Sequence, residues 1–232
     1  MTTTEHLSKQ YDADLESLRS RVLEMGGLVE TQIRDAIASL TEVNEELADR
    51  VIMADHEVNR YEVGIDDSCG QVIVKRQPAA RDLRLIMAIS KTVTDLERIG
   101  DEAVNIGERA QEASRDPGTR VPTPHLRAMA DLTQQMLRDA LDAFVHADVE
   151  RAERVRTGDD AVDDLYGRTL RETMEYMAAH ADRIPAAMGV VSVAKYLERI
   201  ADHATNVAEE VIFMVKGQDV RHADAVASQR RG

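Results

Sequence analysis

The stretch 96–105 reads LERIGDEAVN, and the stretch 197–206 reads LERIADHATN. The two stretches lie 101 residues apart, and over the longer windows 96–108 and 197–209 they are identical at 8 of 13 positions. Such self-similarity indicates a duplicated structural unit, and it constrains the fold before any single residue does. The sequence therefore predicts that one helical segment, with the same pattern of carboxylates, occurs once in each half of the chain.

The repeat continues upstream of these stretches at a slightly different offset. Residues 34–36 recur as residues 138–140, and this offset of 104 also pairs Asp55 with Asp159. Both halves therefore keep a common register over much of their length, apart from three residues lost before the last repeated helix. Fusion of two similar units explains this register.

Helix breakers separate the two units. The segment DPG at 116–118 and the segment PTP at 122–124 end one helix and begin another. We therefore predict one unit over residues 1–118 and a second over residues 119–232. The end of the chain, residues 217–232, begins with glycine and has little hydrophobic periodicity, so we expect a flexible tail there.

Composition and periodicity predict an all-α fold. The chain is 43% hydrophobic but only 3% aromatic, and its 232 residues include just 12 glycines and 5 prolines, which favours long helices over strands. Short connections between such helices force antiparallel neighbours, so we predict two tandem, pseudo-symmetric three-helix bundles with six long antiparallel helices. The expected helices span residues 6–41, 44–76, 79–114, 124–145, 148–180 and 183–216.

Two polar residues are placed to begin the second helix of each bundle. Asn44 precedes two glutamates, and Asp148 stands two residues before Glu150. Asn and Asp are favoured N-cap residues, and acids in the first turn interact well with the helix dipole. We therefore predict that both side chains cap their helices.

The charge of the chain narrows the classes of partner. A formal net charge of −14 argues against nucleic acid and the anionic membrane surface. Basic partners or cations are expected instead, chiefly for the first unit, where residues 1–118 carry 24 acidic and 14 basic side chains against 19 and 15 in the remainder.

The single cysteine, Cys69, can form no internal disulfide. No signal peptide and no apolar run of the ~20 residues needed to span a bilayer is present, so we expect a cytoplasmic protein, at most peripheral to the inner face of the membrane through its partners.

The repeated segment carries a row of oxygen-bearing side chains beside its apolar stripe. With Leu96 set at zero on a helical wheel, Glu97 falls at about 100°, Asp101 at about 140° and Asn105 at about 180°. The second copy places Glu198, Asp202 and Asn206 at the same angles. Carboxylates one turn apart can share a ligand, and carboxylate and amide oxygens favour hard cations such as Mg²⁺, Mn²⁺, Ca²⁺ or iron. These six side chains are the candidate metal ligands.

The same row has a plainer interpretation as a solvated charge ladder, in which Arg98 and Arg199 pair with neighbouring acids. Acidic pairs at 66–67 and 163–164, on the second helices, either complete a metal site or are exposed acids. His203 lies at about 240° on the wheel and is expected to point away from the row.

No sequence motif indicates catalysis. The chain has no Cys/His zinc spacing, no Glu-x-x-His of a di-iron bundle, no Gly-x-Ser-x-Gly turn and no Gly-x-x-x-x-Gly-Lys phosphate loop. We therefore predict a protein that is not an enzyme.

The paired segments resemble the signature of the PhoU family of phosphate-uptake regulators. Residues 95–101 (DLERIGD) and 196–202 (YLERIAD) each match the family's Glu-x-x-x-Asp motif, and residues 11–15 (YDADL), with Met25 and Val29, resemble its first helix. The resemblance covers almost the whole chain. One copy of the motif is common among helices, but the pair is fairly specific.

The resemblance implies a cytoplasmic protein, often dimeric, that links a phosphate-specific ABC transporter to a membrane sensor histidine kinase. Some members bind metal through the carboxylates of the motif, while other members are metal-free. The resemblance implies that Glu97, Asp101, Glu198 and Asp202 are the motif residues of this chain, with iron, zinc, magnesium or manganese as the candidate ions. We accordingly expect a non-catalytic adaptor that negatively regulates phosphate uptake and phosphate-starvation signalling. Its expected partners are the kinase, the cytoplasmic subunits of the transporter and a second copy of the chain. The alternative is a carboxylate-bridged metal-binding or metal-storage protein.

Overall fold

A computed structural model describes residues 3–115, 121–123 and 125–221. These residues form six α-helices and no strand, which confirms the predicted all-α class. The helices are α1 (Thr3–Glu42), α2 (Glu45–Arg76), α3 (Ala80–Arg115), α4 (Leu126–His146), α5 (Val149–Ala179) and α6 (Ile184–Lys216), with a single turn of 3-10 helix, η2 (Ala181–Arg183), ahead of α6.

Local sequence fixes where these helices begin and end. The Asn44 side chain accepts a hydrogen bond from the Leu47 backbone N–H at 3.0 Å, and the Asp148 side chain accepts one from the Arg151 N–H at 3.0 Å, so both predicted caps are confirmed. Helix α6 ends at Lys216 and is capped by Gly217, whose φ of 70° is a left-handed conformation that costs glycine little.

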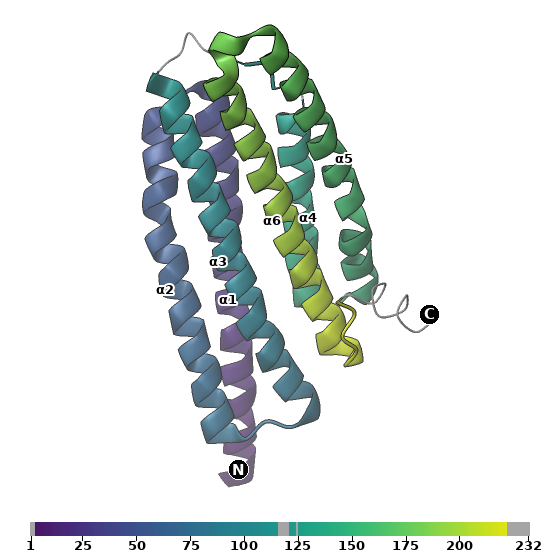
Figure 1. The fold of residues 1–232 in the computed structure, drawn as a ribbon. Helices are drawn as coiled ribbons and strands as arrows, with labels where there is room; N and C mark the ends of the chain where they lie inside the picture. The colour runs from purple at the N-terminus through teal and green to yellow at the C-terminus, as the bar shows by residue number, and fades with distance from the viewer. Residues whose placement is uncertain (1–2, 116–120, 124, 222–232) are drawn as a thin grey trace, which may run out of the picture.

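The helices form two three-helix bundles that lie side by side along their length. Helices α1 to α3 make the first bundle and α4 to α6 the second. In the view of Figure 1, α2, α3, α6 and α5 form one face in that order, while α1 and α4 lie behind them. The bundles meet through α3 against α6 and through α1 against α4. The third helix of each half is therefore central to the molecule.

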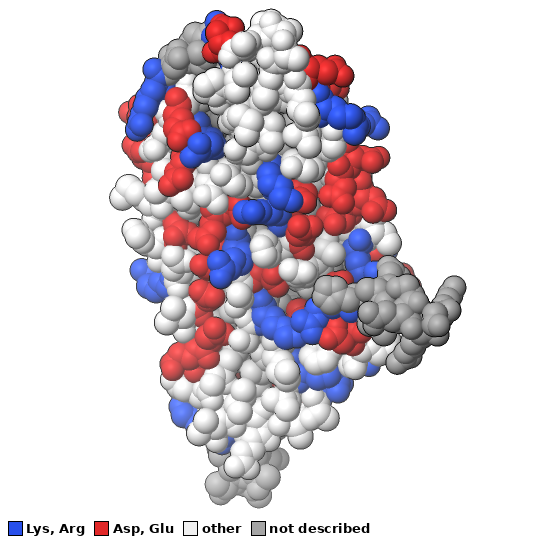
Figure 2. Space-filling model, in the orientation of Figure 1, with Lys and Arg blue, Asp and Glu red and all other residues white. Residues whose placement is uncertain are grey.

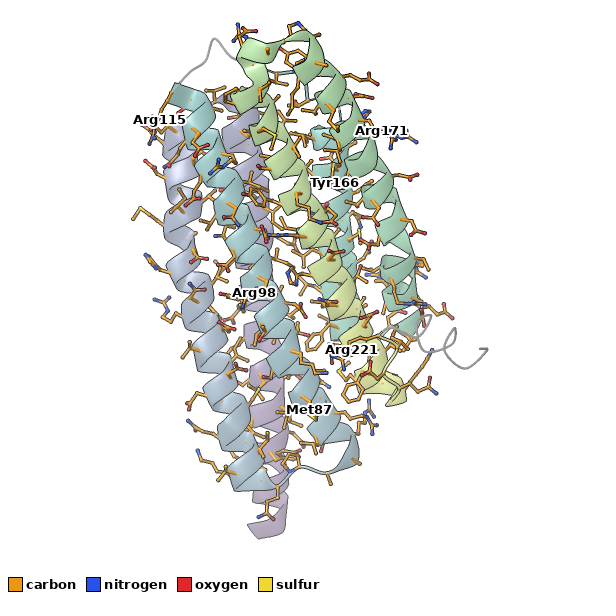
Figure 3. All side chains as sticks on the ribbon, in the orientation of Figure 1. Met87, Arg98, Arg115, Tyr166, Arg171 and Arg221 are labelled. Carbon is orange, nitrogen blue, oxygen red and sulfur yellow. The ribbon has the colours of Figure 1, made fainter. Side chains whose placement is uncertain are left out.

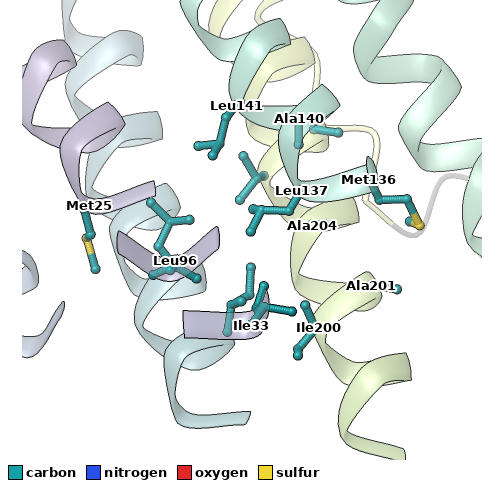
Figure 4. Packing of buried hydrophobic residues seen from close by; sticks show 14 of the residues in the cluster. Met25, Ile33, Leu96, Met136, Leu137, Ala140, Leu141, Ile200, Ala201 and Ala204 are labelled. Carbon is teal, nitrogen blue, oxygen red and sulfur yellow. The ribbon is translucent and has the colours of Figure 1, made fainter. Parts of the chain in front are cut away.

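One hydrophobic core runs through both bundles. On α3 the apolar stripe of the repeated segment is fully buried, and the matching stripe on α6 is buried in the same way. Figure 4 shows Leu96 and Ile33 of the first bundle facing Leu137, Leu141 and Ile200 of the second. Each buried Leu or Ile contributes about 1.5–3 kcal/mol to the free energy of folding. The apolar stripe of the duplicated segment therefore stabilises the core of both halves.

The predicted boundary between the units lies outside the described residues, which omit 116–120 and 124. The first residues of the expected tail are in contact with the bundle: Val220 packs against the core, and Arg221 lies 3.9 Å from the Glu210 carboxylate of α6. Residues 222–232 lie outside the described part of the chain. None of the described helices contains a segment long and apolar enough to cross a membrane.

The contact between α1 and α4 depends on a glycine. A methyl group on Gly26 would lie 2.7 Å from the Leu141 Cδ1 atom, whereas a methyl group on Gly27 would meet nothing within 4 Å. The absence of a side chain at Gly26 therefore makes room for Leu141 where α1 meets α4.

Substituting these neighbouring glycines separates packing from helix propensity. We expect Gly27→Ala to raise the free energy of unfolding by about 0.5–1 kcal/mol, because alanine favours helix more than glycine does. Gly26→Ala should be less stable than Gly27→Ala by about 1–3 kcal/mol, because its methyl group forces Leu141 to move. Urea denaturation measures both values, and equal stabilisation by the two substitutions would contradict the close α1–α4 contact.

Candidate functional site

Carboxylates gather between the second and third helix of each bundle. The first carboxylate cluster, between α2 and α3, and the second carboxylate cluster, between α5 and α6, lie on opposite sides of the α3–α6 contact. Figure 2 shows acidic side chains on both sides of a central group of basic ones on this face. The first cluster contains Asp55, Glu62, Glu97 and Asp101 with Asn59, and the second contains Asp159, Asp163, Glu198 and Asp202.

The first cluster holds carboxylates that are partly desolvated and repel one another. The Glu97 side chain is 18% exposed, and burial raises its pKa, followed by the charges of Asp101 and Glu62. Burial and the charge of Asp101 likewise raise the pKa of Asp55. Arg98, labelled on α3 in Figure 3, lies 3.6 Å from the Glu97 carboxylate, but its side chain is 58% exposed. Such an exposed pair compensates little of the repulsion.

The second cluster contains a carboxylate whose pKa is raised further than those of the first cluster. Burial, then the charges of Asp202 and Asp163, raise the pKa of Asp159 to about 6. Burial and the charge of Glu198 also raise the pKa of Asp202. Lys195 lies 2.6 Å from the Glu198 carboxylate and thus neutralises one of the four acids. The two clusters are therefore similar in donors but different in charge.

Lys195 has a second contact that fixes it in place. Its ammonium group stands 5.4 Å from the centre of the Tyr166 ring on α5, which Figure 3 labels. In the repeat register Lys195 occupies the position of Thr94, so the first cluster has no equivalent cation.

Two aspartates that the sequence-based prediction did not single out are central to these clusters. The Asp55 Oδ1 and Asp159 Oδ1 atoms are buried and have no hydrogen-bond partner. A buried carboxylate oxygen without a donor is costly, and a cation or a proton relieves the cost. The signal that could have found them was present, because the offset of 104 pairs these two residues.

The predicted asparagines face another part of the molecule. The Asn206 Nδ2 atom donates to the Asp95 Oδ1 atom at 3.0 Å, and the Asn105 Nδ2 atom donates to Glu102 Oε2 at 3.1 Å. His203 Nδ1 also meets Asp95 Oδ1, at 2.9 Å, so it shares this partner with Asn206. The metal-ligating role of the two asparagines stays a prediction, and their present partners lie at the contact of α3 with α6.

That contact, called here the α3–α6 seam, is held by pairs that join the two helices. Besides the bonds to Asp95, the Arg199 Nη1 atom donates to Glu102 Oε1 at 3.2 Å, and the Lys91 Nζ atom donates to the buried Glu210 at 2.9 Å. Low numbers on α3 pair with high numbers on α6, so the helices run antiparallel.

A cleft of about 600 Å³ opens along the seam, lined in part by Glu102, Asp202 and Arg199, with Arg221 at its edge. Its positive side chains already pair with carboxylates: Arg199 with Glu102, and Arg221 with Asp219. A phosphate ion there would be repelled by Glu102 and Asp202, whose charges offset those of the two arginines. The cleft is thus a poor site for inorganic phosphate.

The oxygen donors of the two clusters suit a hard cation, but their present positions do not form a complete coordination site. Within the described ranges, no three carboxylate, imidazole or thiolate side chains converge closely enough to hold a metal ion. Their donors are nevertheless all oxygens, and the unpartnered Asp55 and Asp159 atoms are free to coordinate. Metal binding would require rotation of exposed carboxylates toward these atoms.

The whole arrangement matches a known family. The model of the PhoU domain matches residues 22–110 and residues 126–211, one match in each bundle. The chain belongs to the PhoU family. Each matched segment coincides with one of the two repeats, so each repeat is one copy of the domain.

Curated PhoU proteins match along nearly their full length. The chain is 44% identical to the phosphate-specific transport system accessory protein PhoU homolog of Pseudomonas putida, over 94% of this chain and 86% of that protein. It is 42% identical to the phosphate-specific transport system accessory protein PhoU of Escherichia coli, over 96% of this chain and 92% of that protein.

Solved PhoU structures share the fold. The crystal structure of PhoU from Pseudomonas aeruginosa superposes with a TM-score of 0.85 at 40% identity, covering 90% of this chain and 100% of that one. The structure of the phosphate transport system regulatory protein PhoU from Streptococcus pneumoniae gives a TM-score of 0.83 at 26% identity, with coverage of 90% and 99%.

The raised pKa of Asp159 predicts a pH dependence of stability. Between its ordinary value near pH 4 and about pH 6 the folded state binds the Asp159 proton more tightly than the unfolded state does, so stability is lost as the pH rises through this window. We expect Asp159→Asn to be more stable than wild type at pH 7.5 by about 1 kcal/mol after allowance for solvent screening, and equal to it near pH 4.

Urea denaturation at both pH values, in the presence of a chelator, measures this difference. The exposed Asp164 is not among the charges that raise the pKa of Asp159. It provides the control Asp164→Asn, which should change stability by less than ~0.5 kcal/mol at either pH. A stabilisation of Asp159→Asn that is no larger at pH 7.5 than at pH 4 would contradict the assignment.

Proposed function

We propose that this chain acts as a PhoU-type accessory protein of a phosphate transport system. In this role it is a non-catalytic adaptor that negatively regulates phosphate uptake and phosphate-starvation signalling. The observation that carries the proposal is the full-length match, with one Glu-x-x-x-Asp motif in each bundle, to proteins named as phosphate-specific transport system accessory proteins. The Streptococcus pneumoniae relative is named as a phosphate transport system regulatory protein, which supports a regulatory role.

The chemistry of the chain supports an adaptor rather than an enzyme. Its one thiol, Cys69, is buried, and burial raises the pKa of that thiol to about 12, so a thiolate nucleophile is disfavoured. The polar groups of the seam bind one another across the two bundles. Their role is therefore to hold the two bundles together, and we assign them no part in a reaction.

The names of the relatives support a transporter as partner, and the kinase is expected from the family resemblance alone. We propose contacts with the cytoplasmic subunits of a phosphate ABC transporter and with a sensor histidine kinase, which place the chain in the cytoplasm beside the membrane. The acidic side chains that flank the central basic group on this face (Figure 2) favour basic segments on these partners. We also propose a homodimer, which exposed apolar side chains of α2, such as Val63 and Val74, support.

A second candidate function is metal binding at the two carboxylate clusters. It is favoured by the unpartnered Asp55 and Asp159 oxygens and by the mutual repulsion of their neighbours. Iron, zinc, magnesium or manganese are the candidate ions. A bound ion would neutralise the repulsion and hold α2 to α3, and α5 to α6, through the motif residues Glu97, Asp101, Glu198 and Asp202. Metal binding and the adaptor role are compatible.

The regulatory role is tested in a strain that lacks the gene and carries a reporter of phosphate starvation. We expect the reporter to be active at high phosphate in this strain and repressed again when the wild-type chain is supplied. The double variant Glu198→Ala/Asp202→Ala should fail to restore repression if the second cluster contacts a partner or a required ion.

The matched control is Asp160→Ala/Asp164→Ala, which removes the same charge from exposed positions of α5 and should restore repression fully. Crosslinking to the transporter's cytoplasmic subunits and to the kinase should be lost in Glu198→Ala/Asp202→Ala and kept in the wild-type chain and in the control. Normal repression in the deletion strain at all phosphate concentrations would contradict the regulatory proposal.

A further inference from the structure

A small cavity lies between α1 and α2, away from the carboxylate clusters and the α3–α6 seam. Its volume is about 190 Å³, and it lies toward the end of α2, which Figure 1 shows at the same end of the first bundle as the N-terminus. Pockets that enclose drug-sized ligands measure about 300–1,000 Å³, so this cavity suits a small ion. Its lining includes Ser17, Leu18, Arg21, Ser68, Val72 and Lys75.

Arg21 is held at this cavity by a gap in the side chains of α2. Its Nη1 atom donates to the Gly64 carbonyl at 2.9 Å and to the Ser68 Oγ atom at 2.8 Å. A methyl group on Gly64 would lie 2.5 Å from the Arg21 Nη2 atom, so the guanidinium group occupies the space that a side chain at position 64 would need. Glycine weakens a helix relative to alanine, and the fixed position of Arg21 explains its presence inside α2.

Both cations of the cavity keep donors that no protein group accepts within the described ranges. An arginine has five N–H donors and a lysine three. The Arg21 bonds to Gly64 and Ser68 both come from Nη1, which leaves the Nε and Nη2 groups for a ligand. The Lys75 Nζ atom donates to the Gln71 Oε1 atom at 2.9 Å. In the same part of the chain, neither Arg21 nor Lys75 forms an ion pair with a carboxylate.

The carboxylate of Asp14, which also lines the cavity, is compensated by other groups. Its Oδ2 atom accepts two bonds from the Arg76 guanidinium group, at 2.8 and 3.1 Å, and its Oδ1 atom accepts one from the Gln10 amide at 3.1 Å. The bonds from Gln10 and Arg76 lower the pKa of Asp14. With Asp14 engaged in this way, Arg21 and Lys75 leave an excess of positive charge at the cavity.

The second bundle supplies a carboxylate at the equivalent position. The offset of 104 places His125 at the position of Arg21, Glu172 at that of Ser68 and Ala179 at that of Lys75. The His125 Nε2 atom lies 3.0 Å from the Glu172 Oε1 atom, so the contact between Arg21 and Ser68 recurs there with a carboxylate in place of the hydroxyl group. The first bundle therefore has a second cation and lacks the anionic partner, and an anion from solution can take that place.

We propose that the cavity between α1 and α2 is an oxyanion site that binds inorganic phosphate, with Arg21, Lys75 and the Ser17 hydroxyl group as its donors. Guanidinium and ammonium groups bind phosphate through charge-assisted hydrogen bonds. The choice of phosphate among small oxyanions rests on the proposed role in a phosphate transport system. The net charge of −14 disfavours an anionic membrane surface, so we assign the free ion, and not a lipid headgroup, as the ligand.

Isothermal titration calorimetry with inorganic phosphate tests the proposal on the full chain, after metals have been removed with a chelator and by dialysis. We expect saturable binding with a Kd of about 1 mM or below in about 0.15 M sodium chloride. Arg21→Gln should weaken binding at least tenfold, because it removes the fixed guanidinium group. Ser68→Glu, which copies Glu172 of the second bundle, should do the same by pairing with Arg21.

The matched control is Arg60→Gln, which removes the same charge from an exposed position of α2 and should keep the wild-type affinity. Circular dichroism checks that each variant is folded. Lys75→Gln, at an exposed position, should weaken binding about threefold or more, and it carries the test if Ser68→Glu does not fold. Vesicles of phosphatidylglycerol and phosphatidylcholine form a second arm, in which we expect no binding that depends on Arg21.

Four results would overturn the proposal. These are wild-type affinity in Arg21→Gln, an equal loss of affinity in Arg60→Gln, absence of binding at about 10 mM phosphate, and Arg21-dependent binding to vesicles without binding of the free ion. The last result would assign the site to a lipid headgroup. The regulatory proposal would stand in each case, because the starvation reporter tests it separately.

Discussion

Helices α3 and α6 run antiparallel through the middle of the molecule, and each packs at once against its own bundle and against the other. The repeated segment has to serve both contacts. Its apolar stripe is buried inside the bundle, while polar side chains one step further round the helix reach across the seam, as Arg199 does to Glu102. With two sides of each helix occupied in this way, the third side remains for the motif carboxylates, which therefore lie beside α2 and α5.

This placement explains why carboxylates of the motif are partly desolvated. Glu97 and Asp202 lie close enough to the core for burial to raise their pKa values, yet neither cluster contains enough cations to balance its charge. The extensive core of the two bundles offsets this local cost. Sites that keep unfavourable charge in this way are typical of binding functions, because a ligand that neutralises the charge also stabilises the fold.

Much of the fold was predictable from sequence because it depends on local patterns. The helix ranges, the caps at Asn44 and Asp148 and the duplicated core stripe follow from periodicity and from residue preferences within a few positions. The direction of Asn206 was not predictable in this way. At about 180° on the helical wheel it can turn to either flank, and Asp95, a residue more than a hundred positions away, draws it to the seam.

The inner part of the candidate site could not be predicted from the sequence either, because it is formed by residues of different helices. Asp55 lies on α2 and Asp159 on α5, and neither belongs to the repeated motif on α3 and α6. Only the packing of the helices shows that the charges of the motif carboxylates act on them. The offset between the repeats identified Asp55 and Asp159 as equivalent residues, but equivalence alone does not distinguish a ligand from a helix-surface acid.

We propose that the α3–α6 contact holds apart two carboxylate clusters that bind cations, one between α2 and α3 and one between α5 and α6. Anomalous X-ray diffraction from crystals of the wild-type chain grown with Mn²⁺ tests it most directly. We expect anomalous peaks within both clusters, beside Asp55 and Asp159, and none along the seam between Asp95 and His203. Peaks confined to the seam, or none in either cluster at saturating Mn²⁺, would contradict it.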